Sequence, residues 1–146
     1  MDQFAAHRWF AIEFNNEAWS IVEAAEGSPD EMERLVHLAH AACLHWAAVG
    51  TLLNRQRAFD LLAHAYAMAG NADQSVKYAE RARQLSERHG NEQMPFDRAE
   101  ALATMSVALR AAGRLKEADD WRAKAIEAAT RLDDDDRAVI ERLMGR

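Results

Sequence analysis

The chain has 146 residues, of which 49% are hydrophobic and 29% are charged, proportions typical of a folded globular domain and not of a disordered segment. This length predicts one domain over residues 1–146 that folds without a disulfide or a structural metal. The formal net charge of −6 argues against a surface for nucleic acid or for an anionic membrane. We therefore expect neither nucleic acid nor membrane as a partner.

The compartment is predicted from cysteine usage and from the apolar segments. Cys43 is the single cysteine, so an intramolecular disulfide is excluded, and its apolar neighbours predict a small core residue. The N-terminus lacks the apolar stretch of a signal peptide. No segment reaches the ~20 apolar residues that a membrane span needs. A cytoplasmic location is the expectation.

Glycines divide a sequence rich in alanine, leucine, glutamate and arginine, which favour helices. They stand at positions 27, 50, 70, 90, 113 and 145, and glycine is the preferred residue just after a helix because it accepts the left-handed conformation. The segments between them predict helices over 2–26, 29–49, 52–69, 72–89, 95–112 and 115–131, with a short seventh near 134–144. No strand is expected.

Capping residues mark the starts of several predicted helices. Ser28 and Glu31 form the pattern of a capping box, with Pro29 at the first helical position. Further start signals are Asn71 with Gln74, Pro95 and Asp133. Because the connections are short, neighbouring helices are expected to pack antiparallel as hairpins over 2–49, 52–89 and 95–131.

The first two predicted helices each carry an apolar face. In the first helix the face comprises Phe10, Phe14, Ala18, Ile21, Val22 and Ala25. In the second it comprises Leu35, Leu38, Ala42 and Val49. These faces predict the core of the first hairpin.

A repeat is visible around the glycines at 27, 70 and 113, which are 43 residues apart. Eight residues before them stand the large residues Trp19, Leu62 and Met105. Seven before them stand the small residues Ser20, Ala63 and Ser106, and twelve after them stand Ala39, Ala82 and Ala125. A small residue on each helix lets the two helices of a hairpin approach closely, so the spacing predicts three related hairpins.

This repeat resembles the tetratricopeptide pattern of aromatic, leucine, small, tyrosine, glycine and alanine residues. The second unit matches it at Phe59, Leu62, Ala63, Tyr66, Gly70 and Ala82. The third matches at Leu102, Met105, Ser106, Leu109, Gly113, Ala118 and Ala125. The first is degenerate, with Asn16 and Glu23 where large residues are expected. The resemblance implies an all-α fold in which antiparallel helical hairpins stack as a short right-handed superhelix of six or seven helices.

A second resemblance covers nearly the whole chain. The segment from His45-Trp46 through Val49-Gly50 and Asn54 to Arg57-Ala58 is similar to one in a group of small uncharacterised bacterial proteins with tetratricopeptide-like repeats. Phe96-Asp97 followed by Ala99 and Glu100 continues the likeness. The group carries no assigned activity, so this resemblance implies the fold and a bacterial origin and adds no chemistry.

The histidines are the first candidates for a metal site. His37, His40 and His45 lie on one predicted helix, but at 100° per residue His40 lies about 60° from His37 on one side and His45 about 80° on the other. The three therefore cannot converge, and a site would need His64 or Glu33 to complete it. We expect no metal and no cofactor, and ordinary hydrogen-bonded histidines instead.

Trp46, Asn54 and Arg57 surround the connection between the first two hairpins. One interpretation is a structural clamp, in which Asn54 satisfies loop carbonyls and Arg57 pairs with a carboxylate of a neighbouring helix. The other is a concave groove that binds a peptide or a carboxylate. The candidate binding groove comprises His37, His40, His45, Trp46, Asn54, Arg57 and His64.

No catalytic motif is recognisable, and no catalytic residue is predicted. The first hypothesis is a non-enzymatic interaction or scaffold module that binds a protein or peptide partner or a second copy of itself. Trp9, Trp19 and Trp121 are expected to be either packing residues or anchors of a self-interface, and a homodimer is one expectation. The alternative is a small-molecule or metal-binding protein with a polar pocket of histidine, tryptophan, asparagine and arginine between helices.

Overall fold

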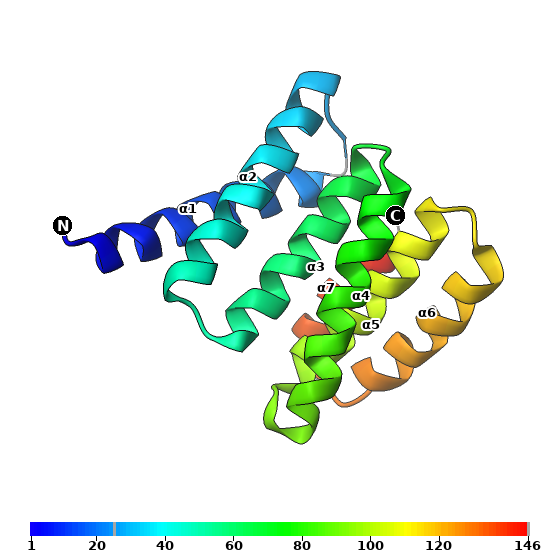
Figure 1. Cartoon of the computed structure of the whole chain (residues 1–146). Helices are drawn as coiled ribbons and strands as arrows, with labels where there is room; N and C mark the ends of the chain where they lie inside the picture. Colours follow the sequence, from blue (N-terminus) through cyan, green and yellow to red (C-terminus); the bar gives the residue numbers. More distant parts are fainter. Residues whose placement is uncertain (25, 146) are drawn as a thin grey trace.

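A computed structural model describes residues 1–24 and 26–145 (Figure 1). Within these residues the chain forms seven α-helices and one short 3-10 helix, with no strand, so the all-α prediction is confirmed. The elements are α1 (Gln3–Ala24), α2 (Pro29–Val49), α3 (Leu52–Met68), α4 (Ala72–His89), η1 (Gly90–Glu92), α5 (Pro95–Ala111), α6 (Leu115–Ala129) and α7 (Asp134–Met144). Ala25 of the predicted apolar face lies outside the described residues.

The predicted capping residues begin the helices as expected. Ser28 Oγ accepts a hydrogen bond from the amide of Glu31, and Glu31 Oε1 accepts one from the amide of Ser28, both at 3.2 Å. Asn71 and Asp133 cap α4 and α7, each with a side-chain oxygen that accepts a hydrogen bond from the amide three residues later. The first amides of a helix have no acceptor inside the helix, and these side chains supply one. Short polar residues are therefore favoured at the position where a helix begins.

Two of the repeat glycines end their helices in the same conformation. Gly70 and Gly113 have φ of 81° and 76°, and the amide after each glycine bonds to the carbonyl of Tyr66 or Leu109 at 2.9 Å. The left-handed prediction is wrong for Gly50 and for Gly145, whose φ values are −89° and −74°. At Gly50 a Cβ atom would lie 2.7 Å from a backbone carbonyl of the preceding turn, so close packing and not dihedral freedom requires glycine.

The helices stack as consecutive hairpins, compatible with a helical repeat fold (Figure 1). Each of α1, α3 and α5 makes its most extensive contacts with the helix that follows it, and α3 also contacts α1 and α5. The last helix, α7, packs against α5 and α6 and lies behind α3 to α5 in Figure 1. Among the described residues no helix is long and apolar enough to cross a bilayer.

The second and third hairpins each contain a hydrogen bond between their two helices, at equivalent positions of the repeat. Ser75 Oγ donates to the carbonyl of Ala63 at 2.7 Å, and Ser106 Oγ donates to the carbonyl of Ala118 at 2.8 Å. The serine lies on the second helix of one hairpin and on the first helix of the other. All four residues are buried, so the small positions of the repeat bring the helices close enough for direct bonding.

The first hairpin departs from this arrangement. Ser20 was expected to pack inside it, but its side chain is exposed and bonds to the carbonyl of Asn16 on its own helix. Ala18 is fully buried and contributes to the core in its place. The prediction for Ser20 is therefore wrong: Ala18 is buried like its equivalent Leu61, but Ser20 is not buried like its equivalent Ala63.

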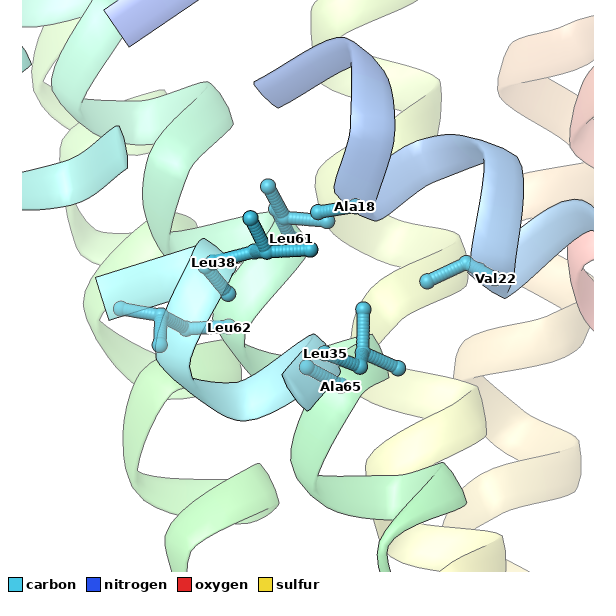
Figure 2. Packing of buried hydrophobic residues seen from close by; sticks show 8 residues of the cluster. Ala18, Val22, Leu35, Leu38, Leu61, Leu62 and Ala65 are labelled. Atoms are coloured by element: carbon cyan, nitrogen blue, oxygen red, sulfur yellow. The ribbon is translucent and has the colours of Figure 1, made fainter. Parts of the chain in front are cut away.

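The main core lies between α1, α2 and α3 (Figure 2). Its buried members are Ala18, Val22, Leu35, Leu38, Ala39, Leu61, Leu62 and Ala65. The leucines of this cluster come from α2 and α3, and alanines come from all three helices. Combining large and small side chains in this way allows dense packing between closely spaced helices.

The first half of α1 is less buried than its apolar face predicts. Its N-terminal end projects from the rest of the molecule (Figure 1). Phe4, Trp9 and Phe10 are 59%, 49% and 39% exposed. The prediction that Phe10 is a core residue is therefore wrong. Exposed aromatic surface of this kind is typical of interaction sites in proteins.

Candidate functional site

The seven predicted site residues do not share one pocket. His37 is exposed, and its Nε2 atom lies 3.8 Å from Oε1 of Glu33, one turn earlier on α2. One turn further, the Nε2 atom of His40 lies 2.6 Å from the hydroxyl of Tyr66. Burial, and then the charge of His37, lowers the pKa of His40. Tyr66 stacks in turn on Tyr78, so His40 belongs to an aromatic contact of α2, α3 and α4.

His45 faces α1 and not its neighbours on α2. Its Nδ1 atom lies 2.8 Å from Nδ1 of His7, and its ring lies beside Phe10 and Phe14. Burial, and then the charge of His7, lowers the pKa of His45. One of the two rings must be neutral to accept the hydrogen bond of the other.

Trp46 and Asn54 stabilise the fold, one by packing in the core and the other by capping a helix. Trp46 is buried against Ala11, Ala42 and Ala58. The Asn54 side chain accepts from the amide of Thr51 at 3.0 Å and completes the capping box of α3. It therefore satisfies an amide, and not the loop carbonyls that the clamp interpretation expected.

Arg57 pairs with a carboxylate of a neighbouring helix, as the clamp interpretation proposed. Its Nε and terminal amino groups donate to the two oxygens of Asp97 at 2.7 and 3.0 Å. The Asp97 side chain is 1% exposed, whereas that of Arg57 is 44% exposed. This bidentate geometry is the strong form of the pair, and it anchors the start of α5 to α3.

Two further polar pairs follow along the same two helices. Asp60 lies beside Glu100, and His64 Nε2 lies 3.3 Å from Thr104 Oγ1. Because the hydroxyl of Thr104 donates to the carbonyl of Glu100, it accepts from His64. Together, these residues form the α3–α5 polar cluster, which comprises Arg57, Asp60, His64, Asp97, Glu100 and Thr104.

Asp60 and Glu100 are the unusual members of the α3–α5 polar cluster. They are 0% and 7% exposed, and neither oxygen of Asp60 accepts a hydrogen bond from a described residue. Burial, followed by the charge of Glu100, raises the pKa of Asp60 well above its usual value. Burial raises the pKa of Glu100 to about 7. A proton on Asp60 turns the pair into a hydrogen-bonded acid and carboxylate.

Sequence reasoning missed Asp60, Asp97, Glu100 and Thr104, although a signal was present. Arg57, Asp60 and His64 have the spacing of one helix face, and Asp97, Glu100 and Thr104 repeat it 40 residues later. Polar residues on one face of two helices that are otherwise rich in apolar residues predict a buried polar contact.

Glu100 opens into one of two cavities that flank α7. The first, here the acidic cavity, has a volume of about 200 Å³ and is lined by Trp19, Glu23, Phe96, Glu100, Val139, Arg142 and Leu143. The second, here the apolar cavity, has a volume of about 280 Å³, and its walls include Val22, His64, Met68, Val107, Arg110 and Met144. Leu143 lines both, so the two cavities adjoin at this side chain, and together they are called the groove along α7.

A larger cavity of about 320 Å³ lies elsewhere, between the start of α5 and α6. Its charged walls are exposed side chains, among them Arg98, Lys124 and Arg131. Charges in contact with water interact weakly with a ligand. The groove along α7 is the better candidate site, because its walls include the nearly buried carboxylate of Glu100, whereas the charged walls of the larger cavity are exposed side chains.

Neither metal chemistry nor a relative identifies the site. Among the described residues no group of three or more His, Cys, Asp or Glu side chains is positioned to hold a metal ion. Cys43 is partly buried, and burial raises the pKa of its thiol. No family model, curated protein or solved structure matches the chain.

Proposed function

We propose that this chain is a tetratricopeptide-like interaction module that binds a peptide segment in the groove along α7. The observation that carries the proposal is the pair of neighbouring cavities between α1, α3, α5 and α7, which share Leu143 and combine apolar walls with the nearly buried Glu100. Apolar surface with a few oriented polar groups is what specific recognition requires. The resemblance of the second and third hairpins to tetratricopeptide units supports the same function.

Selection from a displayed library of random peptides tests this function. We expect selected peptides to converge on a shared sequence and to lose at least tenfold in affinity, about 1.4 kcal/mol, when Val107→Glu places a carboxylate in the apolar cavity. Val107 is half-buried in that wall, so the new charge would be desolvated by a bound peptide.

Ile126→Glu is the matched control. Ile126 is exposed on α6, and no described cavity includes it. Circular dichroism establishes that both variants keep the helical fold. Peptides that fail to converge, or that bind the Val107 variant as tightly as the Ile126 variant, would contradict the proposal.

We also propose self-association through the projecting half of α1. Phe4, Trp9 and Ile12 are exposed there, and large aromatic residues are frequent anchors of protein interfaces. Sedimentation equilibrium is expected to give a dimer for the unmodified chain and a monomer for Trp9→Asp. A monomer at high concentration of the unmodified chain would rule the homodimer out.

A further inference from the structure

We propose that the acidic cavity binds an organic cation, an ammonium or guanidinium group, against the carboxylate of Glu100. The cation is supplied either by a lysine or arginine side chain of a peptide in the groove or by a free amine. In the first case the inference rests on the proposed function; in the second it stands without it.

The first argument is the missing positive partner of Glu100. The side chain lines the cavity and is 93% buried, being 7% exposed. The one described cation that acts on it from within the cluster is Arg57, which already gives two hydrogen bonds to Asp97. A buried carboxylate without its own cation costs free energy. A cation that enters the cavity would therefore form a favourable ion pair with Glu100 that the fold itself does not provide.

The second argument is Asp60, which lies behind Glu100 and deepens the negative end of the cavity. It is fully buried, and neither of its two oxygens accepts a hydrogen bond from a described residue. With no cation present, a proton held between the two carboxyls reduces their repulsion. A bound ammonium replaces that proton as the positive charge, so binding at neutral pH releases a proton.

The walls of the cavity suit a cation on an apolar stem. Trp19 and Phe96 supply aromatic surface, which attracts ammonium and guanidinium groups. Glu23 adds a carboxylate at the exposed rim. A volume of about 200 Å³ is below the ~300 Å³ of the smallest usual ligand sites, so the cavity admits one side chain or a small amine.

Arg142 is the one cationic side chain among the walls of the cavity. It is exposed on α7 and makes no ion pair with a described residue. It competes with an entering cation through repulsion, which water partly screens. Its removal is therefore expected to strengthen cation binding and not to abolish it.

The charged and titratable groups around Glu100 come from four helices. They are Glu23 on α1, Arg57, Asp60 and His64 on α3, Asp97 on α5 and Arg142 on α7. Burial raises the pKa of Glu100 to about 7, so the carboxylate is about tenfold more populated at pH 8 than at pH 6. The affinity for a cation should rise by about the same factor between these pH values.

Titration calorimetry with 1,5-diaminopentane and 1,5-pentanediol tests the site. The diamine is expected to bind and the uncharged diol is not. Glu100→Gln should weaken the diamine at least tenfold, because the amide keeps the shape of the side chain and removes its charge. Arg142→Gln should tighten binding by about threefold. Glu127→Gln, the same change at an exposed residue of α6, should leave binding unchanged.

A peptide arm separates the two sources of the cation. A selected peptide that contains lysine is compared with the same peptide carrying acetyl-lysine. Loss of binding on acetylation identifies a peptide side chain as the ligand, whereas binding of the diamine alone identifies a free amine and counts against the peptide function. A different result would overturn the cation site and leave the proposed function standing. In that case peptide binding is lost in the Val107→Glu variant but is unchanged by acetylation of the lysine, and the diamine does not bind. Equal binding of diamine and diol, or no loss in the Glu100 variant, would also overturn it.

Discussion

Glu100→Gln should make the protein more stable than the unmodified chain at pH 8, by about 3 kcal/mol. Burial raises the pKa of Glu100 from 4.5 to about 7, and each pKa unit corresponds to about 1.4 kcal/mol. The folded state holds this proton more tightly than the unfolded state. The resulting stability is therefore complete below the unfolded pKa of about 4.5 and is lost as the pH rises through 7. Glutamine does not titrate and avoids that loss.

Urea denaturation at pH 5 and pH 8 measures this effect. The difference between the variant and the unmodified chain should be small at pH 5 and large at pH 8. Asp60→Asn should show the same trend, because burial raises the pKa of Asp60 as well. Glu127→Gln, at an exposed position, should change stability by less than about 0.5 kcal/mol at either pH. A Glu100 variant that is less stable than the unmodified chain at pH 8 would contradict the account of the pair.

Arg57→Met should destabilise the protein by about 3 kcal/mol, the lower end of the range for breaking a buried ion pair. The loss arises because the Asp97 side chain, 1% exposed, is left without the arginine that binds both its oxygens. The half-exposed guanidinium places the expected value at the lower end of that range. The methionine retains an apolar stem against the helix surface.

The control for Arg57 is Arg34→Met, which breaks the exposed pair with Glu17. Exposed pairs contribute about 0 to 1 kcal/mol, so the urea midpoint should hardly change. The double variant Arg57→Met with Asp97→Asn should recover much of the lost stability, because no ionised group is left buried. Equal losses for the Arg57 and Arg34 variants would show that the Arg57 pair contributes no more than a surface contact.

If a cation binds at Glu100, ligand and pH act on the same carboxyl pair. Removal of the charge stabilises the empty fold and weakens binding, which is the trade-off expected of a functional site. The Arg57 pair, in contrast, has a partner already and is expected to affect stability without a specific effect on cation affinity. Measurement of both quantities on the same variants therefore separates the site from its structural support.

The helices and their limits could be predicted from the sequence because local chemistry determines them. The observed ends lie within two residues of the predicted ones at every α-helix. Ser28 with Glu31, Asn71 and Asp133 cap amides a few residues away, and Gly70 and Gly113 adopt the left-handed turn that their place after a helix predicts. None of these effects needs a distant part of the chain.

The candidate site was only partly predictable. Arg57 and His64 were among the predicted residues, and both belong to the α3–α5 polar cluster. His37, His40 and His45 were grouped by their shared helix, but His40 faces Tyr66 and His45 faces His7. Residues that are close in sequence on a helix point in different directions, so proximity along the chain was a poor guide.

The sequence by itself determined the all-α class, the helix limits and the small residues that let the second and third hairpins pack closely. Only the tertiary structure decided that Asp60 meets Glu100 and that Glu100 faces the cavity beside α7. Helical periodicity assigns a residue to a face of its own helix, but the partner on another helix depends on how the two axes cross and slide. The burial that raises the pKa of Glu100 arises only when α1, α3, α5 and α7 enclose the carboxylate together.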